Sequence, residues 1–178
     1  MSNIDVFISE EQIRQRVKEL GEEITRDYKG KDKKLFLIAI LKGSVVFLTD
    51  LMRAIDCDLQ IDFMIVSSYG SGTVSSGNIK IIKDLDANAY EHDLLIVEDI
   101  LDSGNTLSKV IEMLKTRNPR SLKVCALLDK PERRKAPVDL DYRGFEIPDE
   151  FIVGYGLDYD EKYRNLPYIG ILKASDIK

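Results

Sequence analysis

Apolar residues along this chain fall into continuous runs and into stripes at helical spacing, and the two patterns alternate. Continuous runs predict strands at residues 35–41, 59–68, 78–85, 94–97 and 121–129. Striped segments between them predict helices at about residues 10–30, 46–55 and 107–118. Strands that alternate with helices predict an α/β protein with a parallel central sheet and right-handed crossovers.

Three further features complete the predicted architecture. Ser9 and Gln12 have the spacing of a capping box and mark the start of the first helix. Residues 68–77 are rich in Gly and Ser, lack apolar anchors and predict a mobile loop. After about residue 135, short apolar pieces interrupted by Pro and Gly predict a small subdomain over the sheet edge. The chain has 178 residues and no repeat or linker, so we expect a single domain, 1–178.

The most informative segment is LLIVEDILDSGNTL, residues 94–107. Its apolar run stops at Glu98 and Asp99, a third carboxylate and the turn S-G-N-T follow, and a helical stripe comes next. The segment predicts a strand, an anion-binding loop and a helix, with the carboxylates at the carboxyl end of a parallel strand, where open α/β sheets bind ligands. Gly104 permits close backbone approach, Ser103 and Thr106 offer hydroxyls, and the first helix amides lack intrahelical partners. These groups predict a phosphate site.

The three carboxylates would repel a phosphate unless something offsets their charge. A hydroxyl-rich sugar, a divalent cation, or both would do so, and we therefore expect a phosphorylated sugar with magnesium. The chain contains neither the G-x-x-x-x-G-K-[ST] motif of P-loop proteins nor a G-x-G-x-x-G that opens a helix after a strand. These two classes of nucleotide-binding site are excluded.

Other candidate residues follow the predicted strands or lie in the tail. Lys42 and Gly43 follow the strand at 35–41, and Lys130 follows the strand at 121–129, at the same sheet edge as the carboxylates. Phe151, before a glycine-flanked turn, could stack on a flat ring, and Arg164 could clamp a second phosphate. The basic cluster 131–135 is interpreted as a solvated turn.

Composition narrows the class of protein. The net charge is −5, which argues against a broad nucleic-acid-binding surface. No apolar run is long enough to span a bilayer, and the N-terminal residues lack the pattern of a secretory signal. A single histidine, His92, and two separated cysteines, Cys57 and Cys125, support neither a zinc site nor a disulfide framework. We expect a cytoplasmic protein that binds neither membranes nor nucleic acids.

Taken together, these motifs resemble those of the bacterial hypoxanthine-guanine phosphoribosyltransferases. VEDILDSGNT is typical of type I phosphoribosyltransferases, which bind phosphoribosyl diphosphate (PRPP); LKGS, SSYGSGT, LLDKPERR and GFEIPDEFIVGYGLDYDEKYRNLP narrow the resemblance to the 6-oxopurine branch. The resemblance covers about Ile4 to Lys173. It implies the type I phosphoribosyltransferase fold, with a hood formed by the N-terminal residues and about 135–178 and a flexible lid loop over about 68–77.

The reaction that the resemblance implies is Mg²⁺-dependent purine salvage. Hypoxanthine or guanine attacks C1 of PRPP, diphosphate leaves, and IMP or GMP forms. The implied partners are these small-molecule substrates, and the family suggests a homodimer or homotetramer.

Residue roles on the PRPP side are also implied by the resemblance. Glu98 and Asp99 would hold the ribose hydroxyls and, with Asp158, would help to bind Mg²⁺, partly through water. The 5′-phosphate loop would comprise Asp102, Ser103, Gly104, Asn105 and Thr106. The diphosphate would contact Lys42, Gly43 and Arg164, with a non-proline cis peptide before Lys42.

The purine side is implied in the same way. Asp102 would be the general base for the N7 proton, and Lys130 would donate to the 6-oxo group. Phe151 would stack on the base, Ile152 would contribute backbone contacts, and Asp158 would lie near the base. The lid loop would present Ser68 and Tyr69.

Three alternatives stay open at this stage. A related transferase could prefer another base; FIVGYGLDY argues against a pyrimidine, and xanthine remains a candidate side substrate. An RNA-binding regulator on the same fold would need a basic face, and the net charge of −5 gives no support for one. A sugar-phosphate binding module without catalysis is disfavoured by the presence of both Asp102 and Lys130.

Overall fold

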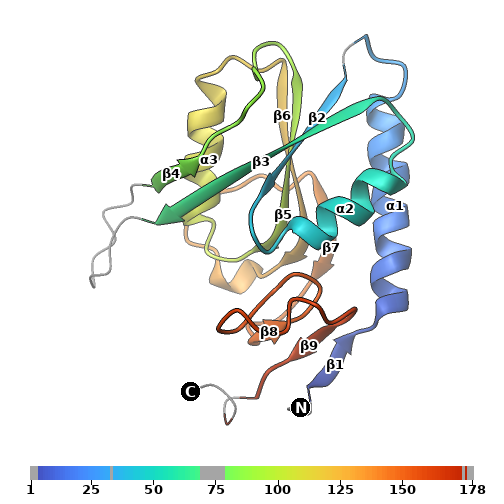
Figure 1. Ribbon diagram of the computed structural model, residues 1–178, viewed down its shortest axis with the longest axis vertical. Helices are drawn as coiled ribbons and strands as arrows, with labels where there is room; N and C mark the ends of the chain where they lie inside the picture. The colour runs from blue at the N-terminus through green and yellow to red at the C-terminus, as the bar shows by residue number, and fades with distance from the viewer. Residues whose placement is uncertain (1–3, 33, 69–78, 174, 176–178) are drawn as a thin grey trace.

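The computed structural model describes residues 4–32, 34–68, 79–173 and 175. Its large sheet has the strand order β4-β3-β2-β5-β6-β7 (Figure 1). These strands are β2 (Leu35–Ile40), β3 (Leu59–Ser68), β4 (Ile79–Lys83), β5 (Asp93–Leu101), β6 (Ser121–Asp129) and β7 (Tyr142–Glu146). Neighbouring strands are parallel except for β4, which pairs antiparallel with β3 at one edge. The expected α/β fold with a mainly parallel sheet is confirmed.

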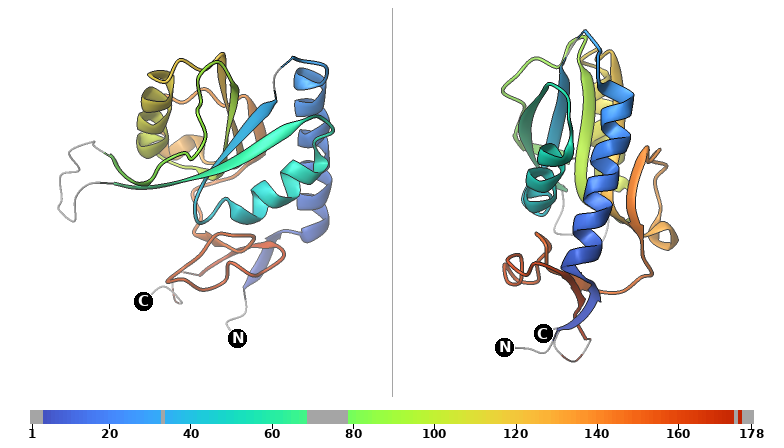
Figure 2. Two further views of the ribbon diagram at one scale, coloured as in Figure 1. Left: turned by 45° about the horizontal axis from the view of Figure 1, so that its top comes forward. Right: turned by 90° about the vertical axis from the view of Figure 1, so that its right-hand side faces the viewer.

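Helices cover both faces of this sheet. On one face lie α1 (Glu10–Tyr28) and α2 (Val45–Ala54), and on the other lies α3 (Asn105–Lys115) (Figures 1 and 2). A short 3₁₀ turn, η1 (Pro131–Arg133), follows β6. The capping box is confirmed, because Ser9 Oγ accepts from the Gln12 amide and Gln12 Oε1 accepts from the Ser9 amide. No helix in the described ranges is long and apolar enough to cross a membrane.

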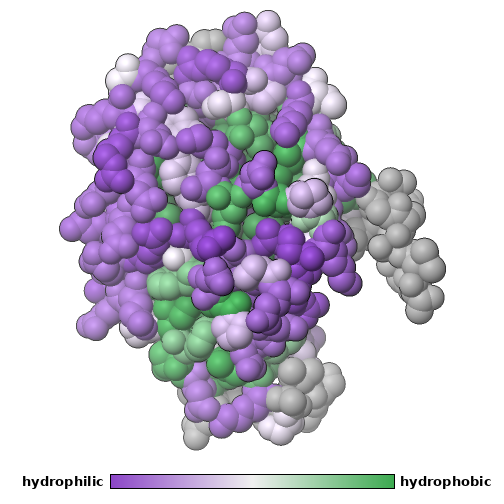
Figure 3. Space-filling view, turned by 180° about the vertical axis from the view of Figure 1, so that it is seen from behind, coloured by the Kyte–Doolittle hydropathy of each residue, from purple (hydrophilic) through white to green (hydrophobic). Residues whose placement is uncertain are grey.

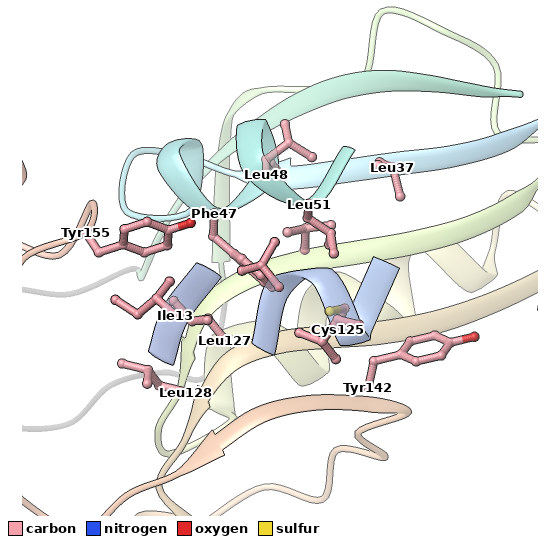
Figure 4. Close-up of a cluster of buried hydrophobic side chains, with 14 of the residues drawn as sticks. Ile13, Leu37, Phe47, Leu48, Leu51, Cys125, Leu127, Leu128, Tyr142 and Tyr155 are labelled. Atoms are coloured by element: carbon pink, nitrogen blue, oxygen red, sulfur yellow. The ribbon is translucent and has the colours of Figure 1, made fainter. Parts of the chain in front are cut away.

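The continuous apolar runs divide their side chains between the two faces. In β2, Leu35 and Leu37 pack with α1 and α2, whereas Phe36 and Ile38 belong to the cluster around α3. Figure 4 shows Ile13 of α1, Phe47 and Leu51 of α2, and Cys125 and Leu127 of β6 meeting in the first of these layers. Central strands therefore need apolar residues at every position, because both of their faces are covered.

A small second sheet lies at the lower end of the large one (Figure 1). It has the order β1-β9-β8, in which β1 (Asp5–Ile8), β9 (Ile169–Ile171) and β8 (Ile152–Val153) join the two ends of the chain. Both pairings are antiparallel. From behind, a band of hydrophilic residues separates an apolar area over the larger body from one over the small sheet (Figure 3).

Two strands differ from the sequence expectations. Residues 142–146 form β7 of the large sheet rather than part of a small subdomain, because Gly144 lets β7 approach β6 so closely that a Cβ atom would lie 2.2 Å from the Leu127 carbonyl oxygen. The strand expected at 94–97 continues to Leu101, because Glu98 and the residues after it keep pairing with β6. Glu98 and Asp99 thus lie within β5.

Candidate active site

The candidate site lies where the ends of β2 and β5 meet. The chain leaves β2 through α2 toward β3 on one side, and leaves β5 through α3 toward β6 on the other. Neighbouring strands whose connections depart in opposite directions open a crevice at their carboxyl ends, and ligands of open α/β sheets bind in such crevices. The loop 41–44 follows β2 and the loop 102–104 follows β5 at this point.

Gly43 lies directly against the carboxylate of Asp99. A Cβ atom at position 43 would lie 1.7 Å from Asp99 Oδ2, so only glycine leaves room for this carboxylate. Gly156, at a φ of +100°, packs on the same loop, and a Cβ atom there would lie 2.1 Å from the Gly43 carbonyl oxygen. The peptide between Leu41 and Lys42 is cis, as expected. Two glycines therefore bring three segments of the chain together at Asp99.

Glu98 and Asp99 form a pair of neighbouring buried carboxylates. Burial, followed by the charge of Asp99, raises the pKa of Glu98 well above its ordinary value. Burial also raises the pKa of Asp99 to about 6, although the Ile100 amide, 2.9 Å from Asp99 Oδ1, and Arg164 act in the opposite direction. Within the described part of the chain, Glu98 Oε2 is buried without a hydrogen-bond partner. This pair can therefore accept a cation or hydroxyl donors.

Asp158 was expected to share a metal with this pair. Its charge contributes to the raised pKa of Asp99, but its Oδ1 atom pairs with Arg164 Nη2 at 2.9 Å. In the ranges that the structure describes, no group of three or more acidic, histidine or cysteine side chains is arranged to hold a metal. Two adjacent carboxylates that face no side-chain cation of their own nevertheless fit Mg²⁺, which binds through one or two carboxylates and completes its shell with water and substrate phosphates.

The loop from Asp102 to Thr106 has the geometry of an anion site. Gly104, at a φ of +78°, precedes α3, whose first amides point out of the helix. The neighbouring segment holds the loop in place, because Ser103 O accepts from the amides of Lys135, at 2.9 Å, and Ala136, at 3.0 Å. Ser103 Oγ accepts from the Asn105 amide at 3.4 Å, a long hydrogen bond that leaves this hydroxyl able to turn toward a ligand.

Asp102, the candidate base, is part of an ion pair that sequence reasoning missed. Arg133 Nε lies 2.8 Å from Asp102 Oδ1, and Arg134 Nε donates to the Asp102 carbonyl oxygen at 3.0 Å. Arg134 also pairs with the buried Asp129, which Arg143 contacts as well. The basic cluster 131–135 is an exposed turn, as expected, but its two arginines are ion-paired and Arg134 is partly buried. Two arginines close after Lys130 have the same sequence signature as an ordinary exposed turn, so the pattern alone did not reveal these contacts.

Lys130, at the end of β6, is buried, with an exposed fraction of 6%. Its amide donates to the Leu101 carbonyl oxygen at 2.9 Å, which ties the end of β6 to that of β5. Its Nζ atom donates to the carbonyl oxygen of Glu150 at 2.6 Å. Lys130 is thus held beside the residue that precedes Phe151.

Phe151 and Ile152 lie at the edge of the small sheet. Phe151 is 43% exposed, which is unusual for so large an apolar side chain, and its ring meets Tyr159 edge to face at 5.6 Å. Ile152 is buried in β8. The exposed face of Phe151 is available to a planar ligand.

Lys42 and Arg164 share one acidic partner. Glu161 Oε2 lies 3.1 Å from Lys42 Nζ, and Glu161 Oε1 lies 3.3 Å from Arg164 Nη2. The hydrogen bond from Lys42 is the main reason that the pKa of Glu161 is lowered. Arg164 Nη1 also donates to the Gly156 carbonyl oxygen at 2.9 Å. Sequence reasoning missed Glu161, although it stands only three residues from both Asp158 and Arg164.

The expected lid lies largely outside the described residues. Ser68 ends β3, where its backbone pairs with Ile79 of β4, and Tyr69 belongs to the range 69–78 that the structure does not describe.

Known proteins resemble this chain in sequence and in structure. The Phosphoribosyl transferase domain family matches residues 8–160. The hypoxanthine phosphoribosyltransferase of Buchnera aphidicola subsp. Schizaphis graminum is 59% identical over 94% of each chain. The hypoxanthine-guanine phosphoribosyltransferase of Bacillus subtilis is 56% identical over 96% of this chain and 93% of its own length.

A solved structure shares the fold. The crystal structure of a hypoxanthine phosphoribosyltransferase from Staphylococcus aureus superposes with a TM-score of 0.93 at 52% identity, covering 98% of this chain and 94% of the other. Likeness on this scale, over nearly the whole chain, shows more than a shared architecture. The chain belongs to the phosphoribosyltransferase family, in its hypoxanthine-guanine branch.

Proposed function

We propose that this protein transfers the 5-phosphoribosyl group of PRPP to hypoxanthine or guanine in a Mg²⁺-dependent reaction of purine salvage, with IMP or GMP and diphosphate as products. The observation that carries the proposal is the buried carboxylate pair Glu98–Asp99 beside the phosphate loop that opens α3. The names of the related bacterial enzymes support the choice of base.

The sugar phosphate fits the end of β5. The loop from Asp102 to Thr106 and the first turn of α3 would bind the 5′-phosphate through backbone amides and hydroxyls. Glu98 and Asp99 would accept hydrogen bonds from the ribose hydroxyls, which satisfies the otherwise unpartnered Glu98 Oε2. Positive charge develops on the ribose as the bond to diphosphate breaks, and nearby carboxylates stabilise that charge.

The leaving diphosphate would lie over the loop after β2. Gly43 allows the backbone to approach it, and Lys42 and Arg164 would neutralise its growing negative charge. In the described part of the chain, Arg164 Nε is buried without a hydrogen-bond partner, as expected for a guanidinium that awaits an anion. Glu161 has to release both cations when this anion binds.

Magnesium would be held by Glu98 and Asp99, partly through water, and Asp158 would have to leave its ion pair with Arg164 to join them. The ion, when bound, supplies positive charge that offsets the negative charge of the leaving diphosphate. The raised pKa values of Glu98 and Asp99 support a cation here, because two adjacent carboxylates stay ionised more readily beside one.

The purine would lie between Lys130 and Phe151. Phe151 would stack on the ring and Ile152 would offer backbone contacts. The Lys130 ammonium can only donate, so it would favour a 6-oxo acceptor over the 6-amino group of adenine. Asp102 would take the N7 proton as the base attacks C1. Xanthine, which also has a 6-oxo group, stays a candidate side substrate.

The surroundings of the reaction are part of the same proposal. The loop 68–77, with Ser68 and Tyr69, would close over the site and exclude water, which would otherwise hydrolyse the activated sugar. The N-terminal strand and the residues after about 150 would form the hood.

The free thiols of Cys57 and Cys125 favour the cytoplasm. A homodimer or homotetramer is the assembly that we expect from the family.

Product analysis tests this proposal. The protein is incubated with PRPP, Mg²⁺ and hypoxanthine, and the mixture is separated by anion-exchange chromatography. We expect IMP and diphosphate in equal amounts, and neither product when PRPP is left out. Diphosphate without nucleotide would contradict the transfer to a base.

A further inference from the structure

Arg133 contacts two carboxylates, those of Asp102 and Asp149. Its Nε atom lies 2.8 Å from Asp102 Oδ1 in an ion pair that is not aligned as a hydrogen bond, and its Nη1 atom donates to Asp149 Oδ1 at 3.2 Å. A guanidinium is planar and presents its donors in a rigid fork, so one arginine can fix the distance between two carboxylates. Both contacts raise the pKa of Arg133, with the hydrogen bond to Asp149 as the larger cause.

Asp149 extends this arrangement to Lys130. Its Oδ1 atom lies 3.7 Å from Lys130 Nζ, which also donates to the carbonyl oxygen of Glu150. Charges of alternating sign therefore run from Asp102 through Arg133 and Asp149 to Lys130. We name this row of four side chains the charge strut.

The charge strut connects side chains at the ends of β5 and β6 whose positions the backbone hydrogen bonds do not determine. The ends of β5 and β6 are tied by the hydrogen bond from the Lys130 amide to Leu101 O, and the turn η1 carries Arg133 directly after Lys130. These backbone contacts do not fix the Asp102 side chain, and the buried Lys130 side chain is fixed separately, by its hydrogen bond to the Glu150 carbonyl oxygen. In the proposed reaction these two side chains address the same edge of the purine, on which N7 and the 6-oxo oxygen are neighbours. Their spacing must match that edge.

We infer that Arg133 is a positioning residue, which holds the Asp102 carboxylate and, through Asp149, the Lys130 ammonium at the spacing of the N7 and 6-oxo atoms of the purine. The inference rests on the proposed function, because it requires Asp102 to act on N7. Arg133 does not itself touch the reacting atoms.

A double-mutant cycle tests this role. Arg133→Ala, Asp102→Asn and the double variant are compared with the unchanged protein by kcat and KM for hypoxanthine and for PRPP. Residues that act through one contact have non-additive effects, with couplings that correspond to roughly two- to a hundredfold. We expect Arg133→Ala to lower kcat/KM for hypoxanthine about tenfold, to leave KM for PRPP unchanged, and to have a clearly smaller effect when Asp102 is already Asn, because only the contact through Asp149 to Lys130 is then left to lose.

Two further variants separate positioning from folding and from net charge. Arg133→Lys keeps the charge but cannot bridge both carboxylates, so we expect only partial recovery. Lys115→Ala removes one positive charge from the far end of α3 and should leave activity unchanged. Arg133 is about half exposed, so its replacement should not unfold the protein, which thermal melting checks.

The possible outcomes are distinct. The positioning role would be overturned if Arg133→Ala lowered kcat/KM for hypoxanthine by the same factor with Asp102 and with Asn at position 102. It would also be overturned if Arg133→Ala alone did not lower this kcat/KM. Full turnover by Asp102→Asn alone would instead remove Asp102 as the base, and with it the part of the proposed function on which this inference rests.

Discussion

The Asp99 carboxylate occupies the space that a side chain at Gly43 would need. Oδ2 of Asp99 lies 1.7 Å from the position of a Cβ atom on Gly43. The contact joins the loop after β2 to the end of β5, and it brings the proposed diphosphate and ribose subsites together at the switch point of the sheet.

Gly43→Ala should therefore damage PRPP binding. The methyl group must push the Asp99 carboxylate away from its place, and displacements of about 1 Å in an active site can lower activity about a hundredfold. We expect kcat/KM for PRPP to fall by about that factor, measured by steady-state kinetics. The thermal melting temperature of the variant serves as the control for folding. If Gly43→Ala left kcat/KM for PRPP unchanged, the close contact between Gly43 and Asp99 would not be needed for PRPP binding.

The raised pKa of Asp99 predicts an unusual pH dependence of stability. Folding raises this pKa from 3.8 to about 6, so the folded protein binds more protons than the unfolded chain in that range. The contribution of Asp99 to the free energy of unfolding therefore falls as pH rises from about 4 to about 6. Asp99→Asn, which removes the buried charge, should stabilise the ligand-free protein by about 1–3 kcal/mol at pH 7.5.

The same stabilisation should largely disappear at about pH 4, close to the pKa of 3.8 in the unfolded chain, because the folded and unfolded forms then bind nearly the same number of protons. Urea unfolding of both proteins at the two pH values measures this. If the two proteins differed in their free energy of unfolding by the same amount at both pH values, the raised pKa of Asp99 would be contradicted.

Glu161 pairs with both Lys42 and Arg164, so in the proposed reaction it would compete with the diphosphate for these cations. Glu161→Gln should release both cations, and we expect KM for PRPP to fall about two- to fivefold, the range of exposed ion pairs. Asp160→Asn is the matched control, because it removes the same charge from the adjacent residue, whose carboxylate pairs with Lys162. A higher KM for PRPP in Glu161→Gln would mean that Glu161 holds these cations in their working positions.

Asp102→Asn keeps the size of the side chain but cannot accept the N7 proton. We expect kcat for nucleotide formation to fall by about 10²–10⁴, the usual effect of a lost acid–base group. Binding of PRPP, followed by calorimetry, should be retained, because the phosphate loop acts through its backbone. Unchanged turnover at neutral pH would remove Asp102 from this role.

Much of the fold could be predicted from the sequence because local patterns decide it. The strands β3 and β6 begin and end at the expected residues, and the Ser9–Gln12 capping box starts α1 as expected. The end of β5 and the place of β7 could not be predicted. Both depend on pairing with β6, a contact between distant segments that leaves no periodic pattern.

The candidate site shows the same division. The motif around Glu98 and Asp102 indicated a phosphate loop and carboxylates, but it could not reveal that Gly43 leaves the space for Asp99. Arg133 and Glu161 were missed because ordinary surface charges have the same sequence signature. Only the fold brings their partners within reach.

The measurement that tests the central claim most directly is a spectrophotometric assay with PRPP and Mg²⁺ on five bases: hypoxanthine, guanine, xanthine, adenine and uracil. The account predicts rapid nucleotide formation with hypoxanthine and guanine, because Lys130 donates to a 6-oxo group, and little or none with adenine and uracil. The reaction should stop when EDTA removes the metal. Turnover of adenine at the rate of hypoxanthine, or no turnover of either 6-oxopurine, would contradict the account.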